Sequence, residues 1–416
     1  MDRDSNTSRA YKRTAHARRK RRRYGTVSLP SATPDESTEI AGGRVITPEG
    51  VHDNGSVILR GSRIDQVRPN YDHARADTTI DATGKVVIPG LIDLHGDDIE
   101  QHLFPRPEAR IDTSAAVANA DRSNVTNGIT TKFHAIAFED DPGDNRTMAT
   151  ARELVETLNS SPELLGDNRI HARCEMTESV RTVRELLERD VGIDLVSLMN
   201  HAPGDGQFDD REAFERRYVD GHDLTADAAQ RLAERRTETD GTTLWERVST
   251  LNSHASEAGV PVASHDDVRP DHIERMAARG VSVCEFPVTM AAAERASELG
   301  LGTVMGAPNL VRGESLYDNL AVEDAVGEGV VDVLCSDYHP PSLLGAPFVS
   351  TDEPLHVRVA RVTSNPADAV GLDDRGRIQA GLRADVLVVD PDPTPTVEHA
   401  FVNGQQVLQA GGTNRN

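Results

Sequence analysis

Hydrophobic residues of this 416-residue chain gather in short runs that alternate with longer charged stretches through the middle of the sequence. Each run is bounded by Gly, Pro or polar residues, and the stretch after it resembles a surface helix. This rhythm is typical of parallel strands covered by helices on both faces. The sequence predicts eight strands, over Val86–Leu94, Thr130–Ala137, Arg169–Met176, Asp194–Asn200, Pro261–Ser264, Val281–Pro287, Thr303–Ala307 and Val331–Ser336.

Eight successive parallel strands favour an α/β fold, a (β/α)8 barrel of the TIM type, over residues 86–370. Residues 39–85 and 371–412 have a different texture, in which short β-like stretches are separated by turn residues. The two flanks can pair with each other. We therefore expect a small β-sandwich module built from both chain ends, with the barrel inserted between its halves.

A charged, helical insertion lies between Asp209 and Glu257, and Thr225 is placed to cap one of its helices. Two positions are open for this insertion. It could roof the mouth of the barrel, or it could be a solvated outer helix, which the density of charge favours.

The charge of the chain is divided unequally between its N-terminal end and the rest. The net charge is −23, but the first 23 residues hold ten Lys/Arg and two Asp, which leaves about −31 on the rest. We expect residues 1–38 to be a disordered basic arm. It could bind nucleic acid or another anionic partner, or be a dispensable extension, or result from a start codon assigned too far upstream. The acidic body argues against nucleic-acid binding by the folded part.

Only four lysines occur among the 45 basic residues. Together with the acidic body, this balance resembles halophilic proteins, whose surface carboxylates keep them hydrated in concentrated salt. The alternative is an ordinary acidic enzyme whose Arg content follows genomic base composition. The three cysteines lie in apolar runs, as expected of reduced thiols in a cytoplasmic protein. No apolar run reaches the eighteen or so residues needed to span a membrane.

Histidines and carboxylates follow directly after several of the predicted strands. A lone His or Asp in such a place is usually structural, but their recurrence at five strand ends favours one shared site at the C-terminal edge of the barrel. Imidazole and carboxylate groups from several elements can hold a divalent metal and leave a position for water. We expect one or two ions of Zn, Mn, Fe or Co, with Glu175 as the bridge if there are two. The predicted metal ligands are His95, Asp97, Glu175, His201, His265 and Asp337.

The motif Pro89-Gly-Leu-Ile-Asp-Leu-His95, the strand-end histidines, Cys335-Ser-Asp337 and the split β-module together resemble the amidohydrolase superfamily, over roughly residues 41–411. The chain departs from that pattern in having His95-Gly-Asp97 for the usual His-x-His. It also has no lysine on a middle strand to bridge two metals. The segments around His102, His171 to Glu175, and Met305 to Gly313 narrow the resemblance to the PhnM-like diphosphatases of the carbon–phosphorus lyase pathway.

This resemblance implies a metal-dependent hydrolase of phosphonate catabolism. It would cleave α-D-ribose 1-methylphosphonate 5-triphosphate, a small phosphorylated sugar, to the 5-phosphate and pyrophosphate. Asp337 would be catalytic and accept a proton from the attacking water. Guanidinium groups match phosphate oxygens, so Arg106, Arg173 and Arg312 are candidate substrate-binding residues. His102 and Asn309 are further candidates for the same role.

Two other functions remain open at this stage. The same metal centre could hydrolyse a cyclic amide or an N-acyl substrate, because fold does not determine substrate. The chain could also be a non-catalytic barrel that binds anions or metal. A homo-oligomer is expected only by analogy with other barrels of the superfamily.

Overall fold

The computed structural model describes residues 36–71, 76–106, 109–141, 145–161, 163–204, 210–221, 224–315 and 319–410. Most of the predicted basic arm therefore lies outside the described residues. The end of that arm is corrected by the structure, because Ser37 and Thr38 already belong to the first strand, β1.

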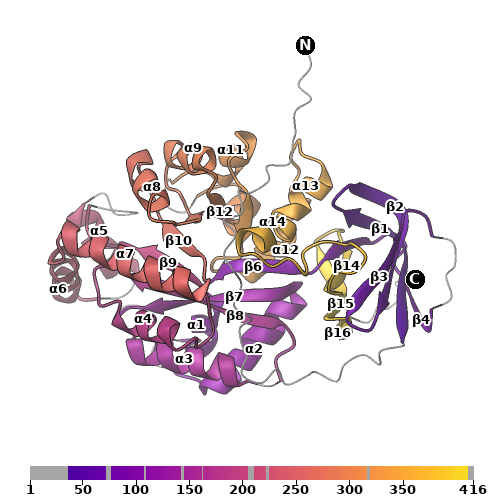
Figure 1. The fold of residues 1–416 in the computed structure, drawn as a ribbon, viewed down its shortest axis with the longest axis horizontal. Coiled ribbons are helices and arrows are strands. Elements are labelled where there is room, and N and C mark those ends of the chain that lie inside the picture. Colours follow the sequence, from indigo (N-terminus) through magenta and orange to yellow (C-terminus); the bar gives the residue numbers. More distant parts are fainter. Residues whose placement is uncertain are drawn as a thin grey trace, which may run out of the picture.

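The predicted barrel is confirmed. Eight parallel strands lie side by side in the order of the sequence, and an isolated bridge between Gly96 and Asp337 joins the last strand end to the first. Figure 1 shows these strands at the centre of the molecule, with helices around them. The barrel strands are β6 (Leu91–Gly96), β7 (Ile129–Phe138), β8 (Asp167–Glu175), β9 (Ile193–Met199), β10 (Val262–His265), β11 (Val283–Glu285), β12 (Gly302–Gly306) and β13 (Val333–Cys335).

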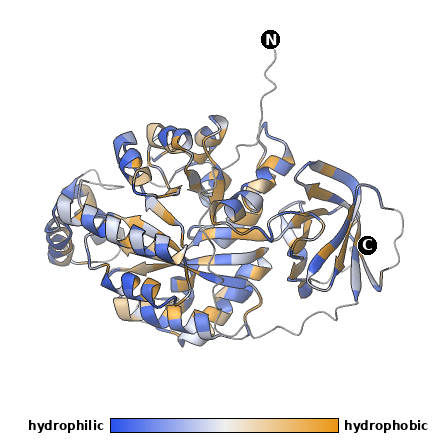
Figure 2. Ribbon diagram, in the orientation of Figure 1, coloured by the Kyte–Doolittle hydropathy of each residue, from blue (hydrophilic) through white to orange (hydrophobic). Residues whose placement is uncertain are grey.

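The helices around the barrel explain why the strand runs are apolar throughout instead of alternating. One face of the strands fills the barrel interior, with Leu94, Phe133 and Val304 among the side chains there, and the other face packs against helices. Figure 2 shows the corresponding change from hydrophobic strands to largely hydrophilic outer helix faces. The helices are α1 (Asp98–Leu103), α2 (Thr113–Thr126), α3 (Met148–Ser160), α4 (Arg181–Glu188), α5 (Arg211–Gly221), α6 (Ala226–Thr237), α7 (Gly241–Ala258), α8 (Pro270–Ala277), α9 (Met290–Leu299), α10 (Ala307–Arg312), α11 (Val322–Gly327), α12 (Pro340–Gly345), α13 (Leu355–Ala360) and α14 (Ser364–Ala369), with a short 3-10 helix over Ala346–Phe348.

The two chain ends form a second sheet, which lies at one side of the barrel (Figure 1). It is one continuous mixed sheet, because β1 pairs in parallel with both β4 and β5. Its two halves share one apolar core, as predicted for a sandwich, with Ile40 and Leu59 from one half and Val386 and Phe401 from the other. The strands are β1 (Ser37–Thr47), β2 (Gly50–Arg60), β3 (Arg63–Arg68), β4 (Thr78–Asp81), β5 (Val86–Pro89), β14 (Val386–Asp390), β15 (Thr396–Val402) and β16 (Gln405–Gln409).

The run predicted as one barrel strand over Val86–Leu94 is divided between the two sheets. Its first part is β5, which pairs with β14 and β1 in the end sheet, and its second part is β6 of the barrel. Gly90 lies at the division, where a Cβ atom would come within 2.1 Å of the Thr130 hydroxyl oxygen. Only a residue without a side chain can pass so close to the second barrel strand.

The insertion consists of α5, α6 and α7, at the opposite side of the barrel from the end sheet (Figure 1). Thr225 caps α6 as predicted, because its side chain accepts a hydrogen bond from the backbone N–H of Ala228. The preference for a solvated outer helix is wrong in one respect. Arg217 and Tyr218 of α5 line the cavity at the barrel mouth, so this part of the insertion covers the site. None of the helices in the described part of the chain combines the length and apolarity needed to cross a bilayer.

Candidate active site

A cavity of about 460 Å³ opens at the C-terminal ends of the barrel strands, a volume within the range of small-molecule sites. Five of the six predicted metal ligands line it, whereas Glu175 is buried behind His201 and is 1% exposed. The structure therefore brings the predicted set together. The five that line the cavity are His95, Asp97, His201, His265 and Asp337.

The backbone at three strand ends adopts the left-handed conformation, with φ of 54° at Asp266, 51° at Phe286 and 54° at Asp337. Such conformations are costly for residues other than glycine and persist only where the surroundings hold them. At Asp337 two backbone hydrogen bonds stabilise this conformation. Its N–H donates to the His95 carbonyl at 2.9 Å, and its own carbonyl accepts from the Asp97 N–H at 2.8 Å. The eighth strand end is thus fixed directly to the first.

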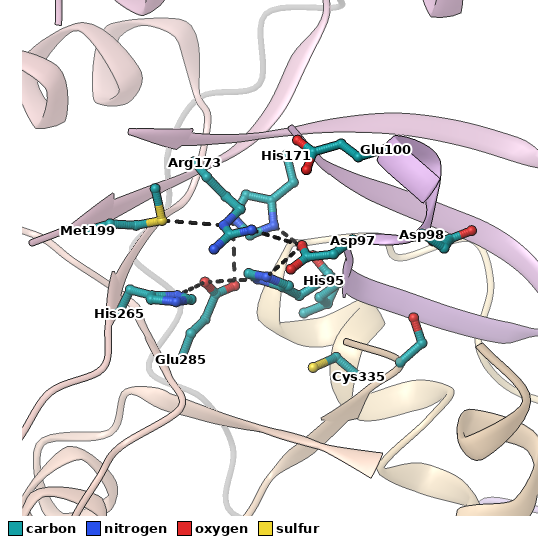
Figure 3. A network of polar contacts seen from close by, with 12 residues as sticks. His95, Asp97, Asp98, Glu100, His171, Arg173, Met199, His265, Glu285 and Cys335 are labelled. Carbon is teal, nitrogen blue, oxygen red and sulfur yellow. Dashed lines mark hydrogen bonds and ion pairs between the residues drawn. The ribbon is translucent and has the colours of Figure 1, made fainter. Parts of the chain in front are cut away.

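Glu285, at the end of β11, lies between two of the predicted histidine ligands (Figure 3). One carboxylate oxygen, Oε2, is 3.3 Å from Nδ1 of His95 and 3.3 Å from Nδ1 of His265. The other oxygen is 3.7 Å from Nε2 of His171. Sequence reasoning missed Glu285 because it lies within the apolar run predicted over Val281–Pro287. The available signal was a lone carboxylate near the C-terminal end of that predicted strand.

The charges in this group perturb the histidines in opposite directions. Burial lowers the pKa of His95, but the carboxylates of Glu285 and Asp97 outweigh it and raise that pKa to about 9. Burial dominates at His171, whose pKa falls to about 3. Two buried atoms, Nε2 of His171 and Oε1 of Glu285, have no hydrogen-bond partner among the described residues. Buried acceptors of this kind, beside imidazoles and carboxylates, fit a group that receives a divalent cation.

A second arrangement of ligand atoms lies on the other side of His265. His201 and His265 approach Asp266 with their Nε2 atoms at 3.8 and 3.7 Å from its Oδ2. His201 also pairs through Nδ1 with Glu175 at 3.0 Å, and Glu139 lies close enough to share an ion with these two. The described residues therefore offer three overlapping groups that could hold a metal. They are His95, His265 and Glu285; His201, His265 and Asp266; and Glu139, Glu175 and His201.

The predicted substrate-binding residues are placed unequally. Arg173 is buried and donates to Asp97 at 3.0 Å, on the cavity wall. Arg312 and Asn309 also line the cavity, and the Asn309 side chain accepts from the Val322 N–H at 3.0 Å. Among the described residues that line the cavity, neither His102 nor Arg106 is found, and Arg106 is exposed.

Two further arginines line the cavity, Arg146 after β7 and Arg217 on α5. Sequence reasoning passed over both because neither adjoins a strand-end motif. Arg236 of α6 is not among the described residues that line the cavity. It is buried between the insertion and the barrel, where it donates to Glu139 at 2.9 Å and to Asp141 at 3.3 Å. Tyr218 donates to the same Asp141 at 2.9 Å, so α5 and α6 are anchored to the barrel by this buried network.

Comparison with known sequences supplies the context for this geometry. No family model matches the chain. The α-D-ribose 1-methylphosphonate 5-triphosphate diphosphatase of Escherichia coli (strain K12) is 34% identical over 351 residues, which cover 80% of this chain and 91% of that protein. The chain belongs to this diphosphatase family. A dihydroorotase of Halobacterium salinarum (strain ATCC 700922 / JCM 11081 / NRC-1) is a weaker match, 27% identical over 80% of this chain and 83% of its own length.

Solved structures that share the fold of this diphosphatase family member are less similar to it in sequence than the E. coli diphosphatase is. A Xaa-Pro dipeptidase with bound methionine superposes with a TM-score of 0.62 at 16% identity, covering 89% of this chain and 99% of that one. A triazine hydrolase variant gives a TM-score of 0.59 at 15% identity, covering 90% and 95%. These likenesses show the fold alone, which is the barrel fold that the sequence predicted.

Proposed function

We propose that this protein hydrolyses α-D-ribose 1-methylphosphonate 5-triphosphate to the 5-phosphate and pyrophosphate. One observation carries the proposal beyond family membership. Four arginines of an otherwise acidic protein line the same cavity as the candidate metal ligands. Guanidinium groups bind phosphate oxygens in a bidentate manner, whereas a neutral amide substrate has no need of them. They are Arg146, Arg173, Arg217 and Arg312.

The arginines stand on two sides of the barrel mouth. Arg173 lies on β8, the third barrel strand, with Arg146 and Arg217 after its two neighbours, and Arg312 follows β12, the seventh. The third and seventh strands of a closed eight-stranded barrel face each other. A sugar with a triphosphate at one end and a phosphonate at the other would place its anionic ends on these two sides. The reacting phosphorus would then lie between them, near the histidines.

Asp337 is proposed as the general base. It lines the cavity, and burial together with the charge of Asp97 raises the pKa of its carboxyl group, which makes the carboxylate a better proton acceptor. In the proposed step, water oxygen bonds to the α-phosphorus, its proton passes to Asp337, and the bond to the bridging oxygen of pyrophosphate breaks. Arg173 and Arg312 hold phosphate and phosphonate oxygens, Asn309 helps to orient the sugar, and roles for His102 and Arg106 stay predictions.

One or two divalent ions are proposed as cofactor, from among Zn, Mn, Fe and Co. The predicted ligands, together with Glu285 and Asp266, would hold these ions. When bound, such an ion supplies Lewis-acid activation of water and of a phosphoryl oxygen. The absence of lysine from the middle strands leaves Glu175 as the proposed bridging carboxylate.

We also propose that the enzyme works in the cytoplasm at high salt. The acidic body and the scarcity of lysine support salt adaptation. Activity that rises with molar KCl would support this, and activity that peaks in dilute buffer would contradict it. A homo-oligomer stays a prediction, and light scattering on the purified protein would establish the state.

The proposed activity is tested with metal-reconstituted protein in high salt, using phosphorus NMR to follow the triphosphate substrate. Pyrophosphate and the ribose 5-phosphate product are expected, and in oxygen-18 water the heavy oxygen should enter the sugar phosphate because attack is at the α-phosphorus. Label in pyrophosphate would overturn the site of attack. An unchanged triphosphate alongside hydrolysis of a cyclic amide or N-acyl substrate would overturn the proposed function.

A further inference from the structure

Lys132 lies on β7, directly beneath the segment that carries His95 and Asp97. It is 2% exposed and is not among the described residues that line the cavity. Its ammonium group is 2.6 Å from Oδ2 of Asp93 and 2.7 Å from Oδ1 of Asp98. A buried lysine with two carboxylates is costly to assemble and needs a complete set of partners.

The third partner of Lys132 lies at the far end of the barrel sequence. Its Nζ donates to the Ser336 hydroxyl at 3.0 Å, and Ser336 immediately precedes the proposed base, Asp337. Asp93 completes the connection, since one of its oxygens accepts from the Ser336 N–H at 2.9 Å and from the His95 N–H at 3.3 Å. One ammonium group therefore links the second barrel strand to the ends of the first and the eighth.

The local backbone is shaped around this ammonium group. The pairing of β6 with β7 shifts between Asp93 and Gly96, so one extra residue bulges from β6 at the position of His95. A Cβ atom at Gly96 would come within 1.9 Å of Nζ of Lys132, so the glycine leaves the space that the lysine fills. Asp98 begins α1, and in Figure 3 its carboxylate points away from that of Asp97.

We infer that Lys132 is a positioning residue of the active site, which holds the His95–Asp97 segment and Asp337 in register. It touches neither substrate nor metal in this role and acts through Asp93, Asp98 and Ser336. The inference rests on the proposed function insofar as turnover is measured with that triphosphate substrate.

Lys85 offers a matched control elsewhere in the molecule. It also pairs with two carboxylates, those of Asp390 at 2.6 Å and Glu398 at 2.8 Å, but it lies in the end sheet. Replacing either lysine by methionine removes one positive charge and two ion pairs. Only the Lys132 replacement alters contacts to the active site.

The test compares K132M, the double variant K132M/D98N and K85M with the wild-type holoenzyme. The double variant removes one of the two carboxylates that K132M leaves buried without its cation, so it should recover part of the lost denaturation midpoint. Its kcat should stay lower by about tenfold to a hundredfold, the range for residues that orient metal ligands, with KM changed little. K85M should keep the wild-type kcat.

A second readout does not depend on turnover. The visible spectrum of bound Co²⁺ reports ligand geometry, so it should change in K132M/D98N and stay the same in K85M. A double variant with wild-type kcat and Co²⁺ spectrum would overturn the inference. If the wild type itself failed to turn over the triphosphate, the proposed function would fall, and the Co²⁺ spectra alone would decide the role of Lys132.

Discussion

The two ends of strand β8 contrast sharply, although each carries a carboxylate whose side chain is at most 7% exposed. At its beginning, Asp167 accepts from Arg375, from Arg169 at 2.9 Å and from Arg383 at 3.5 Å. At its end, Glu175 accepts from the Thr177 hydroxyl at 2.6 Å and pairs with His201 at 3.0 Å. Three arginines bind the carboxylate at the first end, whereas at the second end its bonding partners are a hydroxyl and an imidazole, and the charge of Arg236 lies nearby.

The difference separates a structural charge cluster from a candidate ligand site. Arginine is always charged and cannot bind a metal. The charge of a carboxylate surrounded by arginines is therefore permanently compensated, and the carboxylate is not available as a metal ligand. Imidazole can lose its proton and offer a nitrogen. In the cluster at the barrel mouth, one acceptor on His171 and one on Glu285 have no hydrogen-bond partner among the residues that the structure describes. The N-terminal ends of barrel strands generally serve stability and the C-terminal ends serve chemistry.

Asp337→Asn should give the largest effect at the barrel mouth. The amide cannot accept the proton of the attacking water, so kcat should fall by about a hundredfold to ten-thousandfold. Phosphorus NMR measures the rate, and metal analysis of the same sample shows whether Asp337 is also a ligand. Asp271→Asn, which removes an exposed partner of Arg269, is the control and should keep full activity. Wild-type turnover by the Asp337 variant would exclude it as the base.

Asp167→Ala should instead destabilise the protein. Three arginines would lose a shared buried carboxylate, and breaking such a cluster costs about 3–5 kcal/mol of the free energy of unfolding. Denaturant titration measures the loss, while kcat of the folded fraction should change little. Asp65→Ala removes only an exposed pair with Arg60 and should stay within about 0.5 kcal/mol of the wild type. A large loss of kcat without a loss of stability would break the distinction between the two ends of β8.

Sequence patterns predicted the barrel well because each strand is an apolar run that stops at polar residues. They also placed Glu175 on the third strand, as observed. The division between β5 and β6 was not predicted, because it depends on pairing with β14 nearly three hundred residues further along the chain. Burial of Arg236 likewise depends on carboxylates brought together by the fold.

The candidate site shows the same limit. The histidines could be predicted because they follow directly after apolar strands. In the structure His95, His201 and His265 line one cavity. Glu285 was hidden within an apolar run, and Arg217 lies on a helix whose place over the cavity no local pattern encodes. Residues beside a motif could be predicted, whereas residues brought to the site by long-range packing could not.

Glu285→Ala should weaken metal binding by about tenfold to a hundredfold, because two histidines lose the carboxylate that holds them. Competition with a chelator measures the affinity. Glu314→Ala removes a carboxylate that also lines the cavity but pairs with Arg312, and it should leave metal affinity unchanged. Equal metal affinity in both variants would show that Glu285 belongs with the structural charges and not with the ligand site.

Arg312→Ala should have the smallest effect. It compares an arginine at the barrel mouth with an arginine at the beginning of β8. The Arg312 side chain is 39% exposed and pairs with Glu314, so its loss should raise KM for the triphosphate by only about threefold to tenfold, near 1 kcal/mol, with little change in unfolding. Arg383→Ala, at the Asp167 end, should lower stability and leave KM alone. If both variants changed KM, or both changed only stability, the side of the barrel on which an arginine lies would not determine its role.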